Sequence, residues 1–447
     1  MEYKWPEVKI EDIISNKKNA VAMGPFGSRI KTENFVETGV PVIKGQNLTS
    51  IWLNENEFSY LTEQKAEELK SSLVERGDLV FTHRGTLGQV GYIHEDSKFL
   101  KYIVSQSQMK LSVDKSKVNP LFLYYFFKSD LGQYRLLVNK SQTGVPAIAR
   151  PTNSLKNIKF PMPPLEIQSK IANALVKFDQ KIELNNKMIS NLQEISRTLF
   201  KRWFTDFEFP NEEGEPYRSS GGKMIESEIG LIPEGWSITK LGNIGATVSK
   251  GTTPTRKDID NAIDESAVDF IKVKDISDNG VINYKNTQKI PLSIHQNKLK
   301  RSILKENDIL FSIAGTIGRV SYVNKLKKER NINQAIAFIR LSDPMYFNLV
   351  YQLLKTRNVQ EDVKSKVVQG VQANVSLSIL KDIRVPIPSH QLLKIFNESL
   401  DSSFKQAEEL KTQIDTLSDL RDTLLPKLLS GEIELNDESE VLDDALV

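Results

Sequence analysis

The sequence contains no cysteine, and this absence removes two classes of protein at once. Without cysteine there is no disulfide framework and no cysteine-ligated zinc site. Histidine is scarce too, with four residues at His83, His94, His295 and His390. None of them stands three or four positions from another, the spacing at which one helix face presents two ligands to a metal. The sequence therefore predicts that the chain holds no metal.

Long apolar runs are also missing. No segment approaches the roughly 20 apolar residues that a helix needs to cross a bilayer. The N-terminal stretch "MEYKWPEVKIEDI" is too polar to be the core of a signal peptide. We therefore expect a soluble cytoplasmic protein with no membrane partner.

The usual motifs of catalysis are absent as well. The string "SSGGKM" lacks the first glycine and the Ser or Thr of a phosphate-binding loop, and neither G-x-S-x-G nor H-E-x-x-H occurs. An adenine methyltransferase needs an Asn/Asp-Pro-Pro-aromatic loop, which "MPPL" at 162–165 does not match. Acidic-x-Lys strings such as "DVK" at 362–364 arise by chance in a chain with 57 acidic and 60 basic residues. No residue is predicted to be catalytic, and the pattern favours a recognition protein over an enzyme.

Charge is close to balanced overall, at +3, but it alternates along the chain. Residues 1–163 hold 22 Lys and Arg against 17 Asp and Glu, and residues 230–387 hold 24 against 15. Residues 388–447 hold 5 against 14. Basic blocks attract polyanions because each neutralised phosphate releases counterions. The two basic blocks are compatible with nucleic-acid binding, although ordinary surface charge produces the same pattern.

What the sequence does contain is a long internal repeat. The string "GDLVFTHRGTLGQVGYI" at 77–93 returns as "NDILFSIAGTIGRVSYV" at 307–323. The stretch "KWPEVKIEDI" near the start likewise matches "GWSITKLGNI" at 235–244. The offset between the copies falls from 231 to 225 along the chain, so loops differ by a few residues. A repeat of this length indicates a duplicated domain with a duplicated task.

Each copy has the pattern of an α+β domain of about 150 residues. Short β-branched runs such as "VPVIKG", "GDLVFTH" and "QMKLSV" are bounded by Gly and Asp and are typical of strands. Pro120 and Pro344 each open an apolar helical pattern, and proline suits the first turn of a helix. The predicted fold class is therefore α+β, with two pseudo-repeated domains.

A long, glycine-free, Leu- and Ile-rich segment follows each domain, at 165–204 and 391–429. Apolar residues in both recur at the 3/4 spacing of a coiled-coil seam. About 40 residues at a rise of 1.5 Å make a rod of roughly 60 Å. The predicted helix–helix seam comprises Ile171, Leu175, Phe178, Ile182, Asn185, Ile189, Leu192, Ile195, Leu199, Phe396, Leu400, Ala407, Leu410, Ile414, Leu417, Leu420 and Leu424.

Asn185 is the polar exception in this seam, where the second helix has Leu410. A lone polar seam residue can fix the register of two helices at some cost in stability. A solvated position at the edge of the seam is the alternative.

The ends of the two long segments carry strings that closely resemble a known family. Each segment follows a Pro-x-Pro string, as in "PMPPLEIQSKIANAL" and "PIPSHQLLKIFNESL". The strings at their other ends, "LFKRWFTDF" and "LLPKLLSGEI", are similar too. With two differing α+β domains before them, these strings resemble the specificity (S) subunit of type I restriction-modification systems, over essentially the whole chain. The predicted division is 1–163 target recognition domain 1, 164–207 central helix, 208–229 connector, 230–387 target recognition domain 2, 388–430 C-terminal helix and 431–447 acidic tail.

The resemblance implies a function and a set of partners. Each α+β domain would read one half of a split, asymmetric site in double-stranded DNA, and the two antiparallel helices would hold the domains apart. Two modification subunits carrying S-adenosylmethionine would dock on the helices and methylate adenine. Two restriction subunits, motor nucleases that use ATP and Mg, would translocate and cut unmodified DNA. The chain itself would hold no cofactor.

Base edges are read by Arg, Lys, Asn and Gln, with Ser and Thr assisting, and phosphates are held by Lys and Arg. Candidates of these types stand in the glycine-rich and polar loops between the expected strands, together with His83. In the first domain they are Arg29, Lys31, Lys44, Gln46, Asn47, His83, Arg84, Thr86, Gln89, Gln106, Gln108, Gln142, Thr143 and Arg150. In the second they are Lys250, Thr252, Thr253, Thr255, Arg256, Lys272, Lys274, Ser312, Thr316, Arg319, Asn333, Gln334, Gln369, Gln372 and Asn374.

The copies differ at one position of special interest. His83 and Arg84 stand where the second copy has Ile313 and Ala314, so only the first domain has a cationic donor there. The structural alternative is that the Gly-Thr-x-Gly string merely makes a tight turn. Two other functions stay open at this point: a non-DNA coiled-coil adaptor with two protein-binding domains, and an enzyme with an unrecognised site.

Overall fold

The structure is a computed structural model that describes residues 4–26, 29–48, 50–141, 144–260, 262, 267–285, 287–324, 328–367 and 374–435. Its contacts divide the chain into two compact units. The first unit comprises residues 1–185 and 412–447, and the second comprises residues 186–411. Both long helices pass from one unit into the other, because the division falls inside each of them.

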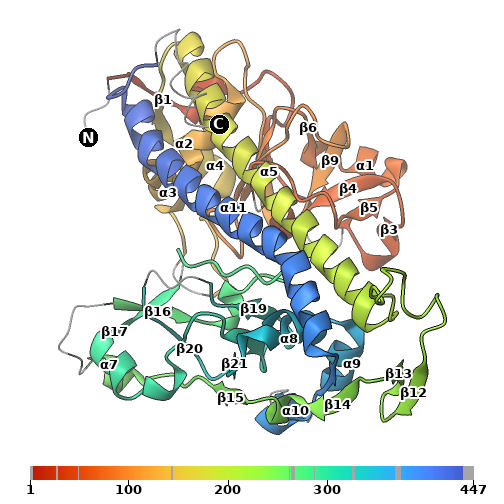
Figure 1. Cartoon of the computed structure of the whole chain (residues 1–447). Helices are drawn as coiled ribbons and strands as arrows, with labels where there is room; N and C mark the ends of the chain where they lie inside the picture. The colour runs from red at the N-terminus through yellow and green to blue at the C-terminus, as the bar shows by residue number, and fades with distance from the viewer. Residues whose placement is uncertain are drawn as a thin grey trace. The chain divides into compact units, whose positions relative to one another are not determined.

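The first unit is built on two small sheets and a strand pair (Figure 1). The four-stranded sheet is antiparallel, in the order β2 (Val21–Met23), β10 (Gln108–Leu111), β7 (Leu79–Thr82) and β8 (Val90–Tyr92). The five-stranded sheet has the order β3 (Phe35–Val36), β5 (Ser59–Leu61), β4 (Val40–Ile43), β9 (Lys101–Val104) and β6 (Leu73–Glu75), with β4 and β9 parallel. The pair is β1 (Glu7–Lys9) with β11 (Lys159–Pro161).

Four short helices complete the first domain: α1 (Glu63–Glu68), α2 (Pro120–Lys128), α3 (Asp130–Leu137) and α4 (Pro151–Lys156). Helix α2 begins as expected, because the Asn119 side chain accepts the Leu121 N–H at 2.9 Å and Pro120 needs no partner. Nearly all of α2 is buried, and the Phe127 ring packs edge-on against Phe81 of β7 at 4.8 Å. This packing joins the four-stranded sheet to the long helices in one core.

The second unit repeats this plan, but one of its sheets has fewer strands. Its four-stranded sheet has the same order, β15 (Ala246–Lys250), β21 (Ile336–Leu341), β18 (Ile309–Ser312) and β19 (Val320–Tyr322). The other sheet keeps three strands, β17 (Gln288–Pro291), β16 (Ala267–Ile271) and β20 (Arg330–Ile332), with β16 and β20 parallel. The strand pair is β14 (Ser237–Lys240) with β22 (Arg384–Ile387).

The helices of the second unit are α6 (Arg256–Asp260), α7 (Leu292–Gln296), α8 (Phe347–Leu354), α9 (Arg357–Ser365) and α10 (Leu377–Lys381). Four of them, α7 to α10, correspond to α1 to α4 of the first, and α6 is additional within the described residues. Thr356 caps α9 by accepting the Val359 N–H, as Ser129 caps α3 by accepting the Gly132 N–H. The connector before this domain is ordered, because Phe209 stacks on Trp236 at 5.3 Å and β12 (Met224–Ser227) pairs with β13 (Gly230–Pro233).

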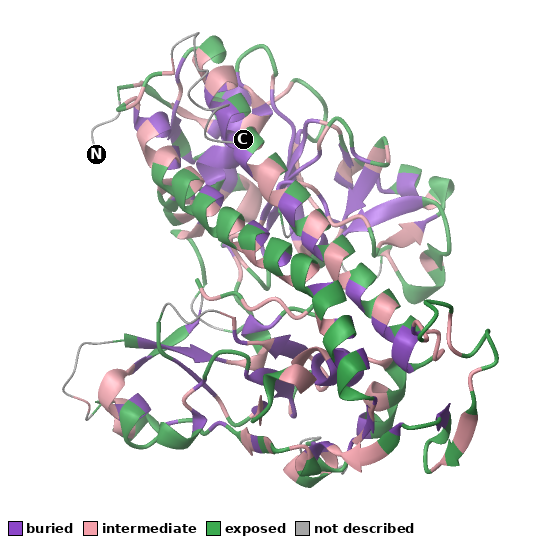
Figure 2. Cartoon of the chain, viewed as in Figure 1, coloured by how far each residue is buried: buried purple, intermediate pink, exposed green. Residues whose placement is uncertain are grey.

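The two long helices are α5 (Leu165–Phe204) and α11 (His390–Ser430), and they run antiparallel. In the first unit the beginning of α5, with Leu175, packs beside the end of α11, with Leu428. In the second unit the end of α5 meets the beginning of α11, where Phe204 contacts Phe396 with ring centroids 4.8 Å apart. Buried and exposed residues alternate along both helices (Figure 2), as an amphipathic seam requires.

Most of the predicted seam is turned away from solvent, with two exceptions. Ile195 is 57% exposed and Leu420 is 40% exposed, so both predictions were wrong. The seam instead continues four residues after Leu192 and Leu417, at Ser196 and Arg421. An α-helix has 3.6 residues per turn, so a run of three- and four-residue steps leaves the next seam position ambiguous by one.

Asn185 lies inside the seam. It is 1% exposed, and its Nδ2 donates to Gln413 Oε1 at 3.1 Å. This burial excludes the alternative of a solvated edge. The predicted role in setting the register stays a prediction.

Candidate nucleic-acid interface

The predicted reading loops of the first domain meet at one edge of the four-stranded sheet. The end of β2, the start of β10 and the end of β7 lie together, since Met109 pairs with Met23 and Gln108 pairs with Thr82. The loop after β7 is tied to the segment before α4 by the Gly85 N–H, which donates to the Pro146 carbonyl at 2.8 Å. We call this set, residues 29–31, 44–47, 82–89, 105–108 and 144–150, the first recognition edge.

The second unit forms the same edge from the equivalent loops. Lys250 at the end of β15 pairs with Ala337, and Ser312 at the end of β18 pairs with Ile336. The bridge between Ala314 and Asn374 matches the bridge between Arg84 and Ala147 in the first unit. The set of residues 250–256, 272–275, 312–319, 333–335 and 374 is the second recognition edge.

The Gly-Thr-x-Gly string shapes both edges. Gly88 and Gly318 have φ of 88° and 96°, a region that favours glycine. A Cβ on Gly88 would come within 2.6 Å of Gln133 Oε1, and one on Gly318 within 2.1 Å of Gln360 Oε1. The string therefore makes a tight turn held under the helix that follows α2 or α8. This structural reading explains why the glycines recur, while the exposed Thr86 and Thr316 beside them remain available.

Several candidates of the first edge are used internally and are poorly placed to read DNA. Asn47 is fully buried; its Oδ1 accepts the Lys44 N–H and its Nδ2 donates to the Asn54 carbonyl, both at 2.8 Å. Gln108 is 1% exposed and donates to Thr82. Gln89 is half-buried, and its Nε2 donates to the Gly45 carbonyl at 2.9 Å. These side chains hold the loops together, so their prediction as base readers is corrected.

His83 is also a structural residue. It is 5% exposed, and its Nε2 lies 3.1 Å from the Gln106 carbonyl. A carbonyl oxygen can only accept, so Nε2 carries the proton and donates. Burial lowers the pKa of His83, and the hydrogen bond to the Gln106 carbonyl partly opposes that shift. The donor that distinguishes the first copy from the second is therefore Arg84 alone, which is exposed.

Two candidates of the second edge need the same correction. Ser312 is fully buried; its Oγ donates to the Thr316 carbonyl at 2.6 Å and accepts the Arg319 N–H at 2.8 Å. The Arg319 guanidinium donates to Asp278 and to the Val273 and Ile276 carbonyls. Both residues stabilise the loop between β18 and β19.

The remaining candidates are placed as follows. Exposed at the edges are Arg29, Lys31, Gln46, Arg84, Thr86, Gln106, Arg150, Lys250, Thr252, Thr253, Thr255, Arg256, Lys274, Thr316, Gln334 and Asn374. Half-buried are Lys44, Lys272 and Asn333. Gln142, Thr143, Gln369 and Gln372 lie outside the described residues. The exposed set contains cations and amides, the residue types that contact phosphates and base edges in protein–DNA complexes.

The family to which these features belong is identified by a sequence comparison. The family model described as type I restriction modification DNA specificity domain matches residues 3–194 and again residues 233–416. The chain belongs to this family. The two matches correspond to the two copies of the repeat, each with its recognition edge and most of a long helix.

Individual relatives agree with the assignment. The MjaIX specificity subunit of a type I restriction enzyme from Methanocaldococcus jannaschii is 26% identical over 97% of this chain and 94% of its own length. The HindI specificity subunit from Haemophilus influenzae is 24% identical over 80% of this chain and 87% of its own. A crystal structure of a type I S subunit from M. genitalium matches with a TM-score of 0.50 and 16% identity, covering 95% of this chain and 96% of that one, and shows the common fold.

The chain is thus the specificity subunit of a type I restriction-modification system, the component that recognises the DNA target and not its catalyst. The predicted family and the α+β class with two long antiparallel helices are confirmed. Within the described residues no group of three His, Asp or Glu side chains is arranged to hold a metal ion. No described helix is long and apolar enough to span a bilayer.

The long helices of this specificity subunit meet each recognition domain through a different set of side chains. In the first unit Arg421 of α11 pairs with Asp179 of α5 at 2.5 Å, and the Tyr125 hydroxyl of α2 donates to the same carboxylate at 2.6 Å. Burial and the Asp179 carboxylate raise the pKa of Tyr125 above its ordinary range. A charged network therefore fixes α2 to both helices.

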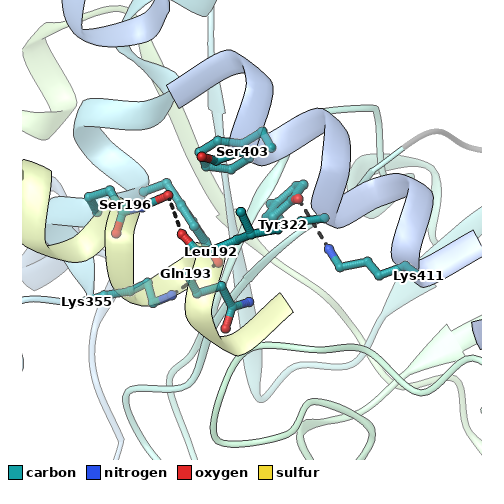
Figure 3. A pocket seen from close by; sticks show the side chains of 11 residues that line it. Leu192, Gln193, Ser196, Tyr322, Lys355, Ser403 and Lys411 are labelled. Atoms are coloured by element: carbon teal, nitrogen blue, oxygen red, sulfur yellow. Dashed lines mark hydrogen bonds between the residues drawn. The ribbon is translucent and has the colours of Figure 1, made fainter. Parts of the chain in front are cut away.

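In the second unit the equivalent positions, 225 to 227 residues away, hold Ser196, Phe404 and Gln352. They line a small cavity of about 20 Å³, room for roughly one water molecule, together with Lys355 (Figure 3). Burial, with the positive charges of Arg197 and Lys411 nearby, lowers the pKa of Lys355 to about 8. This place therefore has a small cavity where the first unit has the Asp179–Arg421 ion pair. The polar contact beside the cavity is the Tyr322 hydroxyl, which donates to Glu408 at 2.7 Å, next to Lys411.

The sequence-based candidates omit two exposed aromatic residues: Phe26, which is 61% exposed in the glycine-rich loop, and Phe35, which is 37% exposed in strand β3. Aromatic side chains are not among the hydrogen-bonding residue types that predict base readers. The available signal was the placement of two basic residues, Arg29 and Lys31, between these two aromatic residues.

Proposed function

We propose that this subunit reads a bipartite, asymmetric site in double-stranded DNA, one half with each recognition domain, residues 1–163 and 230–387. The observation that supports this is the pair of recognition edges, built on the same sheet order but carrying different exposed side chains. The same scaffold presents Arg84 in one domain and Ala314 in the other. Two readers with different side chains recognise two different base sequences.

The proposal extends to the partners. Two modification subunits, with S-adenosylmethionine, methylate adenine at the site, and two restriction subunits, with ATP and Mg, cut unmodified DNA in the cytoplasm. The two long helices set the length of the unspecified spacer. Their exposed apolar residues are suited to hold the modification subunits: Ile195 on α5 and Leu420 on α11 stand 225 residues apart, at equivalent positions of the two copies.

The surface around Ile195 supports a docking role. Ile195 lies in an open surface patch formed by Asn191, Glu194, Thr198, Leu199 and Arg202 of the same helix. An apolar centre with a polar and charged rim is the usual anatomy of a protein–protein contact. The equivalent face of α11, around Leu420, is proposed to receive the second copy of the same partner.

Base-resolution methylation mapping tests the function. The chain is expressed with its cognate modification subunit in a host without adenine methylation. The expected result is one split, asymmetric adenine-methylated motif that disappears when this chain is omitted. No new methylation, with the modification subunit folded and bound to this chain, would contradict the proposal. It would favour the protein-binding adaptor, which predicts no salt-dependent binding to DNA.

A further inference from the structure

The first recognition edge contains an open cleft that its internal hydrogen bonds do not fill. The cleft has a volume of about 430 Å³, in the range of small-molecule sites. One side is apolar, with Pro25, Ile30, Phe35 and Val42. The other side is the polar turn of residues 105–108, together with Lys44 and Gly45.

The polar wall is held rigidly. The Gln108 N–H donates to the Ser105 carbonyl at 3.0 Å and closes the turn. His83 supports it from behind, because its backbone N–H donates to the Ser107 carbonyl and its ring donates to the Gln106 carbonyl. The Gln106 side chain is exposed and makes no hydrogen bond within the described part of the chain. A fixed wall thus presents one free amide to whatever enters.

The apolar wall presents an aromatic face beside a cation. Lys44 Nζ lies 5.5 Å from the centre of the Phe35 ring and donates to Ser59 Oγ at 2.7 Å. Phe35 is 37% exposed although it stands in a strand at the sheet edge. Arg29 and Lys31, both exposed, flank the same loop. The site combines a stacking surface, a free amide and positive charge.

The second unit differs at this place. Gly24 and Gly251 are equivalent, since their N–H groups donate to the carbonyls of Gln108 and Ile336, which start equivalent strands. Two residues later the second copy has Thr253, whose hydroxyl bonds to Gln334, the equivalent of Gln106. The amide that is free in the first domain is engaged in the second.

We propose that the cleft of the first domain binds one nucleobase turned out of the DNA duplex, a base other than the adenine that is methylated. A base has two apolar faces that stack on a ring and a polar edge that bonds to amides and hydroxyls, and these are the two walls of the cleft. A base that stays stacked in the duplex presents only its edge and cannot lay a face on Phe35. The proposal rests on the DNA-reading function proposed above.

The test uses the full chain in complex with its modification subunits and a duplex carrying the mapped motif. Each base of the half-site read by the first domain is replaced in turn by 2-aminopurine, whose fluorescence rises when it leaves the stack. In a second series each of these pairs is made a mismatch. A mismatch lowers the cost of turning a base out, so it tightens binding at a flipped position and weakens binding at a stacked one.

We expect one position besides the methylated adenine at which mismatches tighten binding. At the same position the 2-aminopurine fluorescence should rise on binding or, if stacking on Phe35 quenches it, should rise in the Phe35→Ala variant. Phe35→Ala should weaken binding of the unmodified duplex about tenfold, the loss of one base–aromatic stack. Tyr134→Ala, which removes an aromatic 70% exposed on α3, serves as the matched control and should leave both readouts unchanged.

The proposal is overturned if the complex binds its motif specifically and every mismatch in this half-site weakens binding. It is also overturned if Phe35→Ala and Tyr134→Ala give the same result. If the wild-type complex shows no specific binding at all, the failure belongs to the proposed function, and the cleft proposal falls with it.

Discussion

The two copies of the repeat are alike in backbone and differ in side chains at two places. The order of strands in the four-stranded sheet, the parallel strand pair and the glycine turns are the same in both. The contact with the long helices centres on the Asp179–Arg421 ion pair in the first unit. At that place the second unit has a small cavity beside Ser196, next to the hydrogen bonds from Tyr322 and Lys411 to Glu408. At the recognition edge the Gln106 amide lines an open cleft in the first unit, whereas in the second the equivalent Gln334 amide accepts the Thr253 hydroxyl. The two copies therefore share one backbone plan, and the side chains at these two places differ without changing that plan.

The ionic contact gives the largest expected effect. Arg421→Ser leaves the Asp179 carboxylate, which is 12% exposed, without its cationic partner and with only the Tyr125 hydroxyl bonded to it, and should destabilise the first unit by about 3 kcal/mol. The double change Asp179→Phe with Arg421→Ser copies two of the three equivalent positions of the second unit and should restore part of that loss, because no unpaired charge remains. The recovery is incomplete because the Tyr125 hydroxyl loses its acceptor. Hydrogen exchange of residues 171–185 measures the local opening free energy. Lys405→Ala, which removes an exposed pair with Asp401, is the control and should change little.

Substitutions at Ile195 and Leu420, the exposed apolar residues of α5 and α11, test whether both copies bind the same partner. Ile195→Asp or Leu420→Asp should each weaken the binding of one modification subunit by about 2 kcal/mol, the contribution of one buried Ile or Leu. The double variant should lose both. Mass measurement of the assembled complexes at a fixed concentration counts the subunits. Val138→Asp, at another apolar residue 59% exposed, is the matched control. Equal loss from all three single variants would contradict a specific docking face.

Arg84 and Ala314 sharpen the comparison of the recognition edges. If the Arg84 guanidinium contacts a base edge, Arg84→Ala should relax specificity in one half-site only, by roughly 1–3 kcal/mol. Methylation mapping shows the change as a degenerate base at one position. Ala314→Arg should alter the other half-site alone. A uniform loss of methylation at all sites would instead assign Arg84 to a phosphate.

The cavity beside Lys355 in the second unit gives the smallest expected effect, a dependence of the free energy of unfolding on pH. Lys355 loses its proton near pH 8 in the folded chain, whereas an unfolded lysine keeps it to about 10.5. The unfolded state therefore binds more protons between these values, so the free energy of unfolding of the second unit should rise across that window, by on the order of 1 kcal/mol after allowance for partial exposure. Lys355→Met should abolish the rise, which denaturant titration at pH 7.5 and 10 measures. Lys364→Met, at an exposed lysine of α9, should leave it.

Much of the frame could be predicted from the sequence. The strings "GDLVFTH" and "QMKLSV" became β7 and β10, and the strand pattern of each copy followed from period-two runs bounded by turns. The two long helices began and ended within a few residues of their glycine-free segments. Such signals lie within short stretches of the chain, so a single sequence is sufficient to show them.

The site was harder to predict because residue type does not say where a side chain's hydrogen bonds go. Asn47, His83 and Ser312 are polar loop residues of the kind that reads DNA, but their donors and acceptors are used inside the fold. Ile195 and Leu420 fit a seam by spacing, and only packing showed that the next residue takes that position. Which loops share an edge depends on long-range strand pairing, which no local pattern contains.

The most direct test of the central claim, one half-site per recognition domain, is methylation mapping of a chain in which residues 1–163 replace residues 230–387. If each domain reads its own half-site and the helices present them in opposite senses, the methylated motif becomes symmetric, with the first half-site repeated as its reverse complement. The spacer should be preserved within a base pair or two. A folded complex that still methylates the original asymmetric motif would contradict the account.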